Sequence, residues 1–223
     1  MTDRRYDVVT FDCYGTLIDW RAGISAAFQE AESRDGLKLP VDDLLRLYAE
    51  IEPEVEKEAY RSYRAVLTET ARRVGTRVGW PMSEERAAFL AESLPGWRPF
   101  PDTNPALERL ARAGYALGIL SNVDDDLLAA TRRHFTVDYE LIVTAQQVGS
   151  YKPAPGHFTT ARQRLGGRRW LHAAQSYFHD VVPAGALGIP VAWINRHGQP
   201  TPEGGVTPDR EFDLLSEPAD WLV

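Results

Sequence analysis

The sequence predicts an α/β fold, in which a parallel sheet has helices on both faces and a block of helices is inserted. Two patterns support this prediction. Short apolar runs rich in β-branched and aromatic residues alternate with segments of helical periodicity, and strands joined by helical crossovers form a parallel sheet. Between residues 20 and 95 the alternation stops and helical patterns follow one another, which indicates an insertion after the first strand.

The predicted strands run into polar turns. The first strand, YDVVTF at 6–11, ends at the turn DCYGT, and the second, YALGIL at 115–120, ends at Ser121-Asn122. Further strands are expected at 141–144, 172–176, 189–194 and 212–215. The helices expected between the strands cover 105–113, 126–134, 155–165 and 182–187.

In parallel sheets of this kind, ligands bind beyond the carboxyl ends of the strands. Polar residues that follow these strands or their loops are therefore expected to meet at one site. They are Asp12, Ser121, Lys152 and Asp180.

The inserted block is expected to form a lid over the strand ends. Its helical patterns cover 23–31, 41–51, 59–74 and 83–93. Ser83 followed by two glutamates is typical of a helix start, because a serine oxygen and acidic side chains stabilise the first turn. We therefore predict a core of residues 1–19 and 96–223 and a helical cap of residues 20–95, with LPGWRPFP at 94–101 as the return hinge.

Composition and charge exclude several classes of protein. The chain has 223 residues, 43% of them hydrophobic, which is enough to build a packed core. It carries 25 Lys+Arg against 32 Asp+Glu, a net charge of −7, so general binding to nucleic acid or to an anionic membrane is not expected. A small anion could still bind in a locally positive pocket.

Cysteine usage and hydropathy indicate the compartment. A single cysteine, Cys13, allows neither an intramolecular disulfide nor a cysteine zinc cluster. The N-terminal apolar stretch is interrupted by Asp7 and Asp12, and no run of about 18 apolar residues is present. The protein is therefore expected to be cytoplasmic.

The residues at the strand ends can carry out nucleophilic chemistry. A desolvated carboxylate such as Asp12, held by a turn with Gly15 and Thr16, can act as a nucleophile. Lys152 would keep that carboxylate ionised. Alternatively, Asp12 and Asp180 cap turns and Lys152 is a solvated loop charge, but their joint occurrence favours a site.

Four short motifs resemble those of the haloacid dehalogenase superfamily, in the same order and at the same spacing. They are Asp12-x-Tyr14-Gly15-Thr16-Leu17, Ser121-Asn122, Tyr151-Lys152-Pro153 and Asp180. The resemblance spans nearly the whole chain. It implies a Rossmann-like core with a helical cap inserted after the first motif.

Two positions separate the branches of this superfamily. Its phosphatases typically carry a second Asp in the first motif and another acid shortly before the fourth-motif Asp. Here these positions hold Tyr14 and Gln175. In those phosphatases the first of these acids protonates the leaving oxygen and the second helps to hold magnesium. Because magnesium prefers hard anionic oxygens, loss of the second acid weakens the metal site, and no metal or other cofactor is expected. A phosphatase with a weakened magnesium site remains one alternative, and a non-catalytic protein that binds a small acid remains a second.

The motifs instead resemble the 2-haloacid dehalogenases. This resemblance implies that Asp12 displaces halide from a small 2-haloalkanoic acid and that water then hydrolyses the aspartyl ester to a 2-hydroxy acid. It also implies the remaining roles: Thr16 fixes the Asp12 loop, Ser121 and Lys152 hold the substrate carboxylate, Asn122 cradles the halide, and Asp180 activates the water. Tyr14 is included among the substrate-binding residues.

The sequence departs from this branch at two places. Gln175 and Tyr177 replace the usual Ser and Asn before the fourth-motif Asp, and no arginine stands near residue 41, where the family places a halide-binding arginine. Arg46, Arg61 and Arg64 are the candidates for that role, with a solvated helix face as the alternative. The expected partner is a small anionic carboxylate substrate, and relatives of this type suggest a homodimer.

Overall fold

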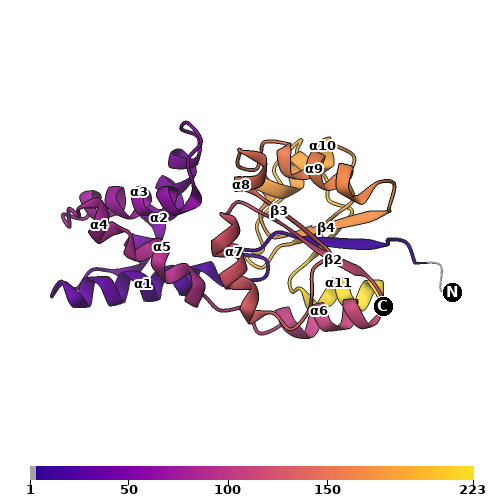
Figure 1. Cartoon of the computed structure of the whole chain (residues 1–223), viewed down its shortest axis with the longest axis horizontal. Coiled ribbons are helices and arrows are strands. Elements are labelled where there is room, and N and C mark those ends of the chain that lie inside the picture. Colours follow the sequence, from indigo (N-terminus) through magenta and orange to yellow (C-terminus); the bar gives the residue numbers. More distant parts are fainter. Residues whose placement is uncertain (1–3) are drawn as a thin grey trace. The chain divides into compact units, whose positions relative to one another are not determined.

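The computed structural model describes residues 4–223, and Figure 1 shows its elements along the chain. The structure has two compact units. The first contains the described residues up to Asp19, together with Pro99–Asn122 and Arg133–Val223, and the second contains Trp20–Arg98 and Val123–Arg132. The second unit thus includes the helical block at 20–95 and also residues 123–132, which the sequence analysis had assigned to the core.

The first unit is built on a six-stranded sheet in which every neighbouring pair is parallel. The strands are β1 (Val8–Phe11), β2 (Ala116–Ser121), β3 (Leu141–Thr144), β4 (Trp170–Ala174), β5 (Val191–Ile194) and β6 (Arg210–Phe212). Their order is β3-β2-β1-β4-β5-β6. The strand order therefore reverses direction between β1 and β4, which is where sheets of this kind bind ligands.

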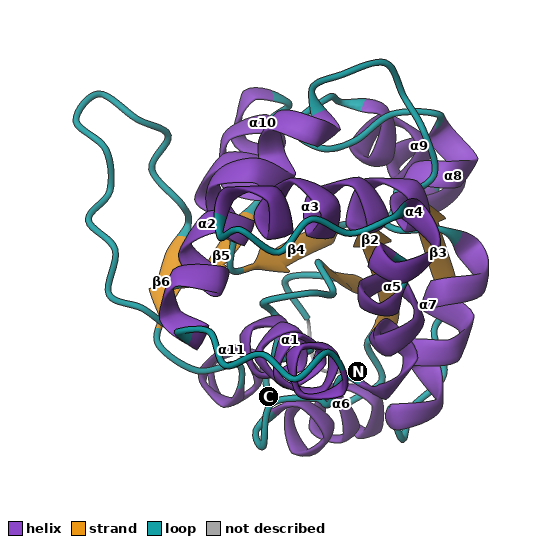
Figure 2. Ribbon diagram, turned by 90° about the vertical axis from the view of Figure 1, so that its left-hand side faces the viewer, coloured by secondary structure: helices purple, strands orange, loops and turns teal. Residues whose placement is uncertain are grey.

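Helices cover both faces of this sheet, as Figure 2 shows. The helices of the first unit are α6 (Thr103–Arg112), α8 (Ala145–Val148), α9 (Gly156–Leu165), α10 (Val182–Ala186) and α11 (Ser216–Leu222). In Figure 2, α8, α9 and α10 lie on one side of the strands, and α6 and α11 on the other. The central strands are buried on both faces, and this is why they read as continuous apolar runs. The predicted α/β fold is confirmed.

Two strands begin earlier than the sequence analysis predicted. The strand β4 begins at Trp170, which pairs with Val8, rather than at the predicted residue 172. It ends at Ala174 rather than at 176. In β6, Phe212 is the last strand residue, because the amides that follow at 213 and 214 donate to the carboxylate of Glu217 and form a turn before α11. Both boundaries depend on contacts with other segments, which local propensity does not contain.

A π-helix at Tyr177–Val181 lies between β4 and α10. The Ser176 hydroxyl caps it by accepting the His179 amide at 3.1 Å. The sequence analysis expected a helix only from residue 182. The π-helix places Asp180 in the first turn after β4, with its side chain buried.

The second unit is helical. Its elements are α1 (Trp20–Arg34), α2 (Val41–Glu56), α3 (Tyr63–Arg77), α4 (Glu84–Ala87), α5 (Phe89–Ser93), the 3-10 turn Leu94–Gly96 and α7 (Asp125–Thr131). The carboxylate of Asp124 accepts the backbone N–H groups of Tyr63 and Arg64, both at 2.9 Å. Because these are the first two amides of α3, Asp124 caps that helix and fixes the α7 segment to it.

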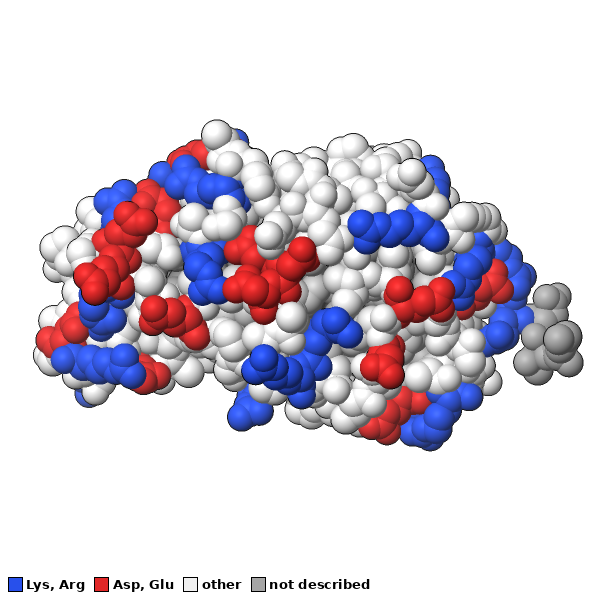
Figure 3. Space-filling view, in the orientation of Figure 1, with Lys and Arg blue, Asp and Glu red and all other residues white. Residues whose placement is uncertain are grey.

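Charged side chains are interspersed on the face shown in Figure 3. Many of the arginines pair with nearby acids, as in the ion pairs Arg72–Glu69 at 2.7 Å and Arg86–Asp35 at 3.0 Å. Within residues 4–223, none of the helices combines the length and apolar character needed to span a bilayer.

Candidate active site

Asp12 follows β1 and is held by its own turn. Its amide continues the ladder to β4 by donating to Ala173 O at 3.2 Å. The chain then turns sharply at Gly15, whose φ of 101° is a conformation that favours glycine. This turn brings the Thr16 hydroxyl within 3.0 Å of Asp12 Oδ2, to which it donates. Thr16 Oγ1 in turn accepts a hydrogen bond from the backbone N–H of Gln175 at 2.8 Å. This bond joins the loops after β1 and β4.

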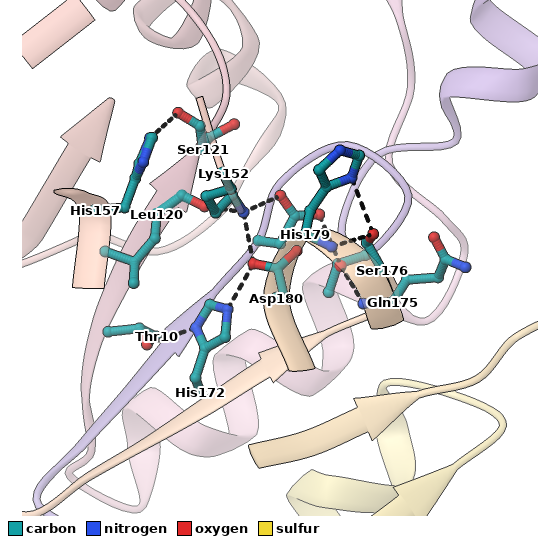
Figure 4. A network of polar contacts seen from close by, with 12 residues as sticks. Thr10, Leu120, Ser121, Lys152, His157, His172, Gln175, Ser176, His179 and Asp180 are labelled. Atoms are coloured by element: carbon teal, nitrogen blue, oxygen red, sulfur yellow. Dashed lines mark hydrogen bonds and ion pairs between the residues drawn. The ribbon is translucent and has the colours of Figure 1, made fainter. Parts of the chain in front are cut away.

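Lys152 lies at the centre of the site. Its side chain is 1% exposed, and Nζ donates to Asp12 Oδ1 at 3.0 Å, Asp180 Oδ1 at 2.6 Å and the carbonyl of Leu120 at 2.9 Å. These three bonds use the three ammonium hydrogens. Figure 4 shows Lys152 joining the ends of several strands at this point. The predicted meeting of Asp12, Lys152 and Asp180 is therefore observed.

Asn122 positions the Lys152 backbone. Its Oδ1 accepts the Lys152 amide at 2.7 Å, and its Nδ2 donates to the Lys152 carbonyl at 3.1 Å. This pair of bonds fixes the loop after β3 to the end of β2. The observed contacts give Asn122 a positioning function, whereas its predicted contact with halide stays a prediction.

Ser121 ends β2 with a fully buried side chain. Its Oγ makes no hydrogen bond within residues 4–223, although a buried hydroxyl normally has a partner. Its carbonyl is contacted by His157 Nε2 at 3.0 Å. Burial, together with the positive charge of Lys152, lowers the pKa of His157 to about 3, so this ring is neutral at physiological pH.

Asp180 is buried and lies between two nitrogen donors. Its Oδ1 accepts from Lys152 Nζ and lies 2.9 Å from Nε2 of His172, on β4. Burial alone would raise its pKa, but the charge of Lys152 and the His172 hydrogen bond lower the pKa of Asp180 to about 2. Asp180 is thus a carboxylate at neutral pH.

The pKa values of Asp12 and Lys152 are raised, whereas that of Asp180 is lowered. Burial raises the pKa of Asp12 above its usual range, while Lys152 and Thr16 oppose that rise. Burial would lower the pKa of Lys152, but the two carboxylates outweigh it and raise the pKa, so the ammonium keeps its charge. The arrangement is a buried carboxylate whose ionised form is stabilised by one lysine.

Several functionally placed residues were missed in the sequence analysis. His172 and Thr10 lie in strand interiors, and the only sequence signal was a polar residue within each apolar run. Arg196, which lies shortly after β5, was not among the predicted site residues. It donates to the Thr16 carbonyl at 3.0 Å, forms two bonds to Asp102 at 3.1 Å, and lies 4.0 Å from the Phe100 ring centroid. Arg196 therefore anchors the turn that carries Thr16.

Three further residues were predicted to bind substrate. Arg61 and Arg64 lie just before α3 and on it, and Tyr14 lies in the first unit. Arg64 forms an ion pair with Asp126 at 2.7 Å, and its side chain is 46% exposed. Arg61 pairs with Glu58. Tyr14 lies in the turn after Asp12 and is half-buried. The substrate contacts expected of these three residues stay predictions.

The donor groups of the site do not suit magnesium. Asp12 and Asp180 are joined by an ammonium group, and the two positions that would add carboxylates are Tyr14 and Gln175. No group of three or more His, Cys, Asp or Glu within residues 4–223 is arranged to hold a metal ion. Magnesium is usually held by one or two carboxylates together with water and substrate oxygens, and here the Lys152 ammonium group already occupies one oxygen of each carboxylate.

Comparison with known families agrees with this geometry. Residues 6–174 match the family of haloacid dehalogenase-like hydrolases. The chain belongs to this family. It is 27% identical over 223 residues to (S)-2-haloacid dehalogenase H-109 of Pseudomonas putida, covering 96% of this chain and 97% of that protein.

One further relative is a phosphatase, and one solved structure shows the same fold. The chain is 25% identical over 206 residues to a glyceraldehyde 3-phosphate phosphatase of Methanothermobacter thermautotrophicus, covering 84% of each protein. Its fold matches L-2-haloacid dehalogenase from Xanthobacter autotrophicus with chloropropionic acid covalently bound, with a TM-score of 0.81, 21% identity, and coverage of 96% and 97%.

Proposed function

We propose that this hydrolase removes halide from a small 2-haloalkanoic acid and releases the 2-hydroxy acid through an ester on Asp12. The observation that carries the proposal is the bonding of Lys152 Nζ to both Asp12 and Asp180 in a buried site. A single lysine between two carboxylates supports a carboxylate nucleophile and a second carboxylate that activates water. Similarity to the (S)-2-haloacid dehalogenases supports the same reaction.

The first half-reaction is a displacement at carbon. A carboxylate oxygen of Asp12 forms a bond to C2 of the substrate, the carbon–halogen bond breaks, and halide leaves with the electron pair. Desolvation of the Asp12 carboxylate makes it more reactive, and Lys152 and Thr16 fix its orientation.

The second half-reaction hydrolyses the ester. Asp180 takes a proton from water, and the water oxygen bonds to the Asp12 carboxyl carbon. The bond from that carbon to the substrate oxygen then breaks, and the proton on Asp180 passes to the departing oxygen. Asp12 finally ionises and releases one proton to solvent, so haloacid and water yield hydroxy acid, halide and a proton.

Substrate binding follows from the polar groups near Asp12. Because the three hydrogens of Lys152 Nζ are used within the site, we assign Lys152 to orienting the carboxylates and Ser121 Oγ to the substrate carboxylate. Tyr14 is proposed to line the substrate position. The helical unit is proposed to act as a cap, with Arg61 or Arg64 as the halide-binding cation.

The donor set favours a reaction that does not use magnesium, because the acids of a phosphatase site are replaced by Tyr14 and Gln175. The similarity to a phosphatase makes the alternative worth testing in the same experiment. We further propose that the enzyme acts in the cytoplasm and does not bind nucleic acid, in keeping with its net charge of −7.

Halide release in a metal-chelated buffer tests the proposal. We expect the purified protein to release chloride from (S)-2-chloropropionate in the presence of EDTA, and Asp12→Asn to abolish this release. Magnesium-dependent hydrolysis of p-nitrophenyl phosphate without chloride release would establish the phosphatase instead. Tight binding of 2-chloropropionate with turnover of neither compound would establish a binding protein.

A further inference from the structure

His172 is a fully buried histidine directly beneath the site. It lies in the interior of β4, and its side chain is 0% exposed. One ring nitrogen, Nε2, lies 2.9 Å from Asp180 Oδ1, and the other, Nδ1, lies 2.9 Å from Thr10 Oγ1 on the neighbouring strand β1. Figure 4 shows the three side chains in a line that ends at the Lys152 network.

The hydrogen positions follow from the chemistry of the partners. A carboxylate only accepts hydrogen bonds, so Nε2 carries a hydrogen that it donates to Asp180. The Thr10 hydroxyl forms a hydrogen bond with Nδ1, and this bond fixes the opposite end of the ring. The edge-on Phe158 ring, with centroids 5.2 Å apart and an interplanar angle of 89°, holds the imidazole from the side.

This arrangement distinguishes the two oxygens of Asp180. Oδ1 accepts from both Lys152 and His172, so its lone pairs are occupied. Oδ2 is buried and makes no hydrogen bond within the described part of the chain. When two donors fix one oxygen of a carboxylate, the other oxygen points in a single direction.

We propose that His172, held by Thr10, is a positioning residue that orients Asp180 for the hydrolysis of the Asp12 ester. This inference rests on the proposed function. Oδ2 is the oxygen that accepts the proton from water, and His172 fixes its direction without touching the reacting atoms. Within the described residues the polar contacts of the His172 ring are with Thr10 and Asp180 and not with Asp12, so formation of the ester is expected to depend little on His172.

The test separates the two half-reactions. Single-turnover mixing of enzyme with (S)-2-chloropropionate, followed by acid quench and mass spectrometry, measures the Asp12 ester as it forms and decays. His172→Leu removes the donor but keeps an apolar group of similar size. We expect ester decay to slow by about tenfold or more in this variant, as loss of a hydrogen bond to a charged group predicts, while ester formation changes little. The ester should then accumulate in the steady state.

His172→Gln is the matched control, because glutamine is close to histidine in length and ends in an N–H donor. It should restore much of the rate of ester decay. Equal slowing of ester formation and decay in His172→Leu, or equal behaviour of the Leu and Gln variants, would overturn the proposal. A variant that only loosened the fold would not change the ratio of the two rates in this selective way.

Thr10 supplies a second, independent pair of variants. Thr10→Val removes the hydroxyl while keeping the shape of the side chain, whereas Thr10→Ser keeps the hydroxyl. We expect ester decay to slow in Thr10→Val and not in Thr10→Ser, which tests the inference even if His172→Leu does not fold. A wild-type protein that releases no halide and forms no ester would instead refute the proposed function itself.

Discussion

Substitution of Lys152 by methionine should destabilise the folded protein strongly at neutral pH. The ammonium group is buried and bonds to two carboxylates, at 3.0 and 2.6 Å, and to one carbonyl, at 2.9 Å. Methionine fills a similar volume without charge, so Asp12 and Asp180 would lose their common counter-charge. Removing one partner of a buried ion pair costs about 3–5 kcal/mol, and two lost bonds to charged groups give a similar figure.

The loss of stability should also depend on pH. With Lys152 absent, one of the two carboxylates would take up a proton in the folded state, with a pKa above its unfolded value of about 3.9. The folded variant then binds more protons than its unfolded chain, so its stability rises relative to wild type as the pH falls. The deficit at pH 7.5 should therefore be larger than the deficit at pH 5.

Urea denaturation followed by tryptophan fluorescence at these two pH values measures the effect. Lys38→Met makes the same chemical change at an exposed position and should leave the midpoint unchanged. A loss below about 1 kcal/mol at pH 7.5, or a loss that is the same at both pH values, would refute the description of Lys152 as the buried counter-ion of this site.

Three further predictions follow from the same contacts. Because burial raises the pKa of Asp12, the acid limb of kcat/KM should lie above the usual aspartate value of 3.8, and a limb at or below 3.8 would contradict the assignment. Because the pKa of Asp180 is lowered to about 2, the stability it contributes should be complete above about pH 5 and decline towards pH 2; the difference in urea midpoint between wild type and Asp180→Asn should show this decline. Asp124→Ala should lower the free energy of unfolding by about 0.5–2 kcal/mol through loss of the α3 cap, and Asp124→Asn by less, as thermal unfolding can check.

The sequence was sufficient to predict the sheet and the residues that meet at its edge. Apolar runs and helical periods are local signals, so the alternation of strands and helices could be read directly. Asp12 and Lys152 could be placed near one another because parallel strands direct their carboxyl ends to the same edge.

Other features depend on contacts between distant segments and could not be predicted. His172 reads as one polar residue in an apolar strand until pairing places Thr10 directly beside it, across a separation of 162 residues. The inclusion of residues 123–132 in the helical unit is of the same kind, because Asp124 caps a helix about 60 residues earlier in the chain. Such contacts have no local periodicity.

Residues 175 and 177, where this chain differs from the dehalogenase pattern, make contacts that hold the loop after β4. The backbone N–H of Gln175 donates to Thr16 Oγ1 and its backbone carbonyl accepts from Trp193 Nε1 at 2.9 Å, and neither contact uses the glutamine side chain. The Tyr177 hydroxyl donates to the Val206 carbonyl at 2.7 Å and so holds the loop after β5. Both residues support the loop after β4 that leads to Asp180.

The most direct test of Asp12 as the nucleophile is to follow the oxygen of water during turnover. The enzyme is incubated with (S)-2-chloropropionate in ¹⁸O-water for several turnovers, digested, and the peptide that contains Asp12 is analysed by mass spectrometry. Attack of water on the ester carbonyl places ¹⁸O in the Asp12 carboxylate, and in a single turnover the hydroxy acid carries unlabelled oxygen. Labelled product together with unlabelled Asp12 would mean that water attacks the substrate directly, and would contradict the proposed nucleophile.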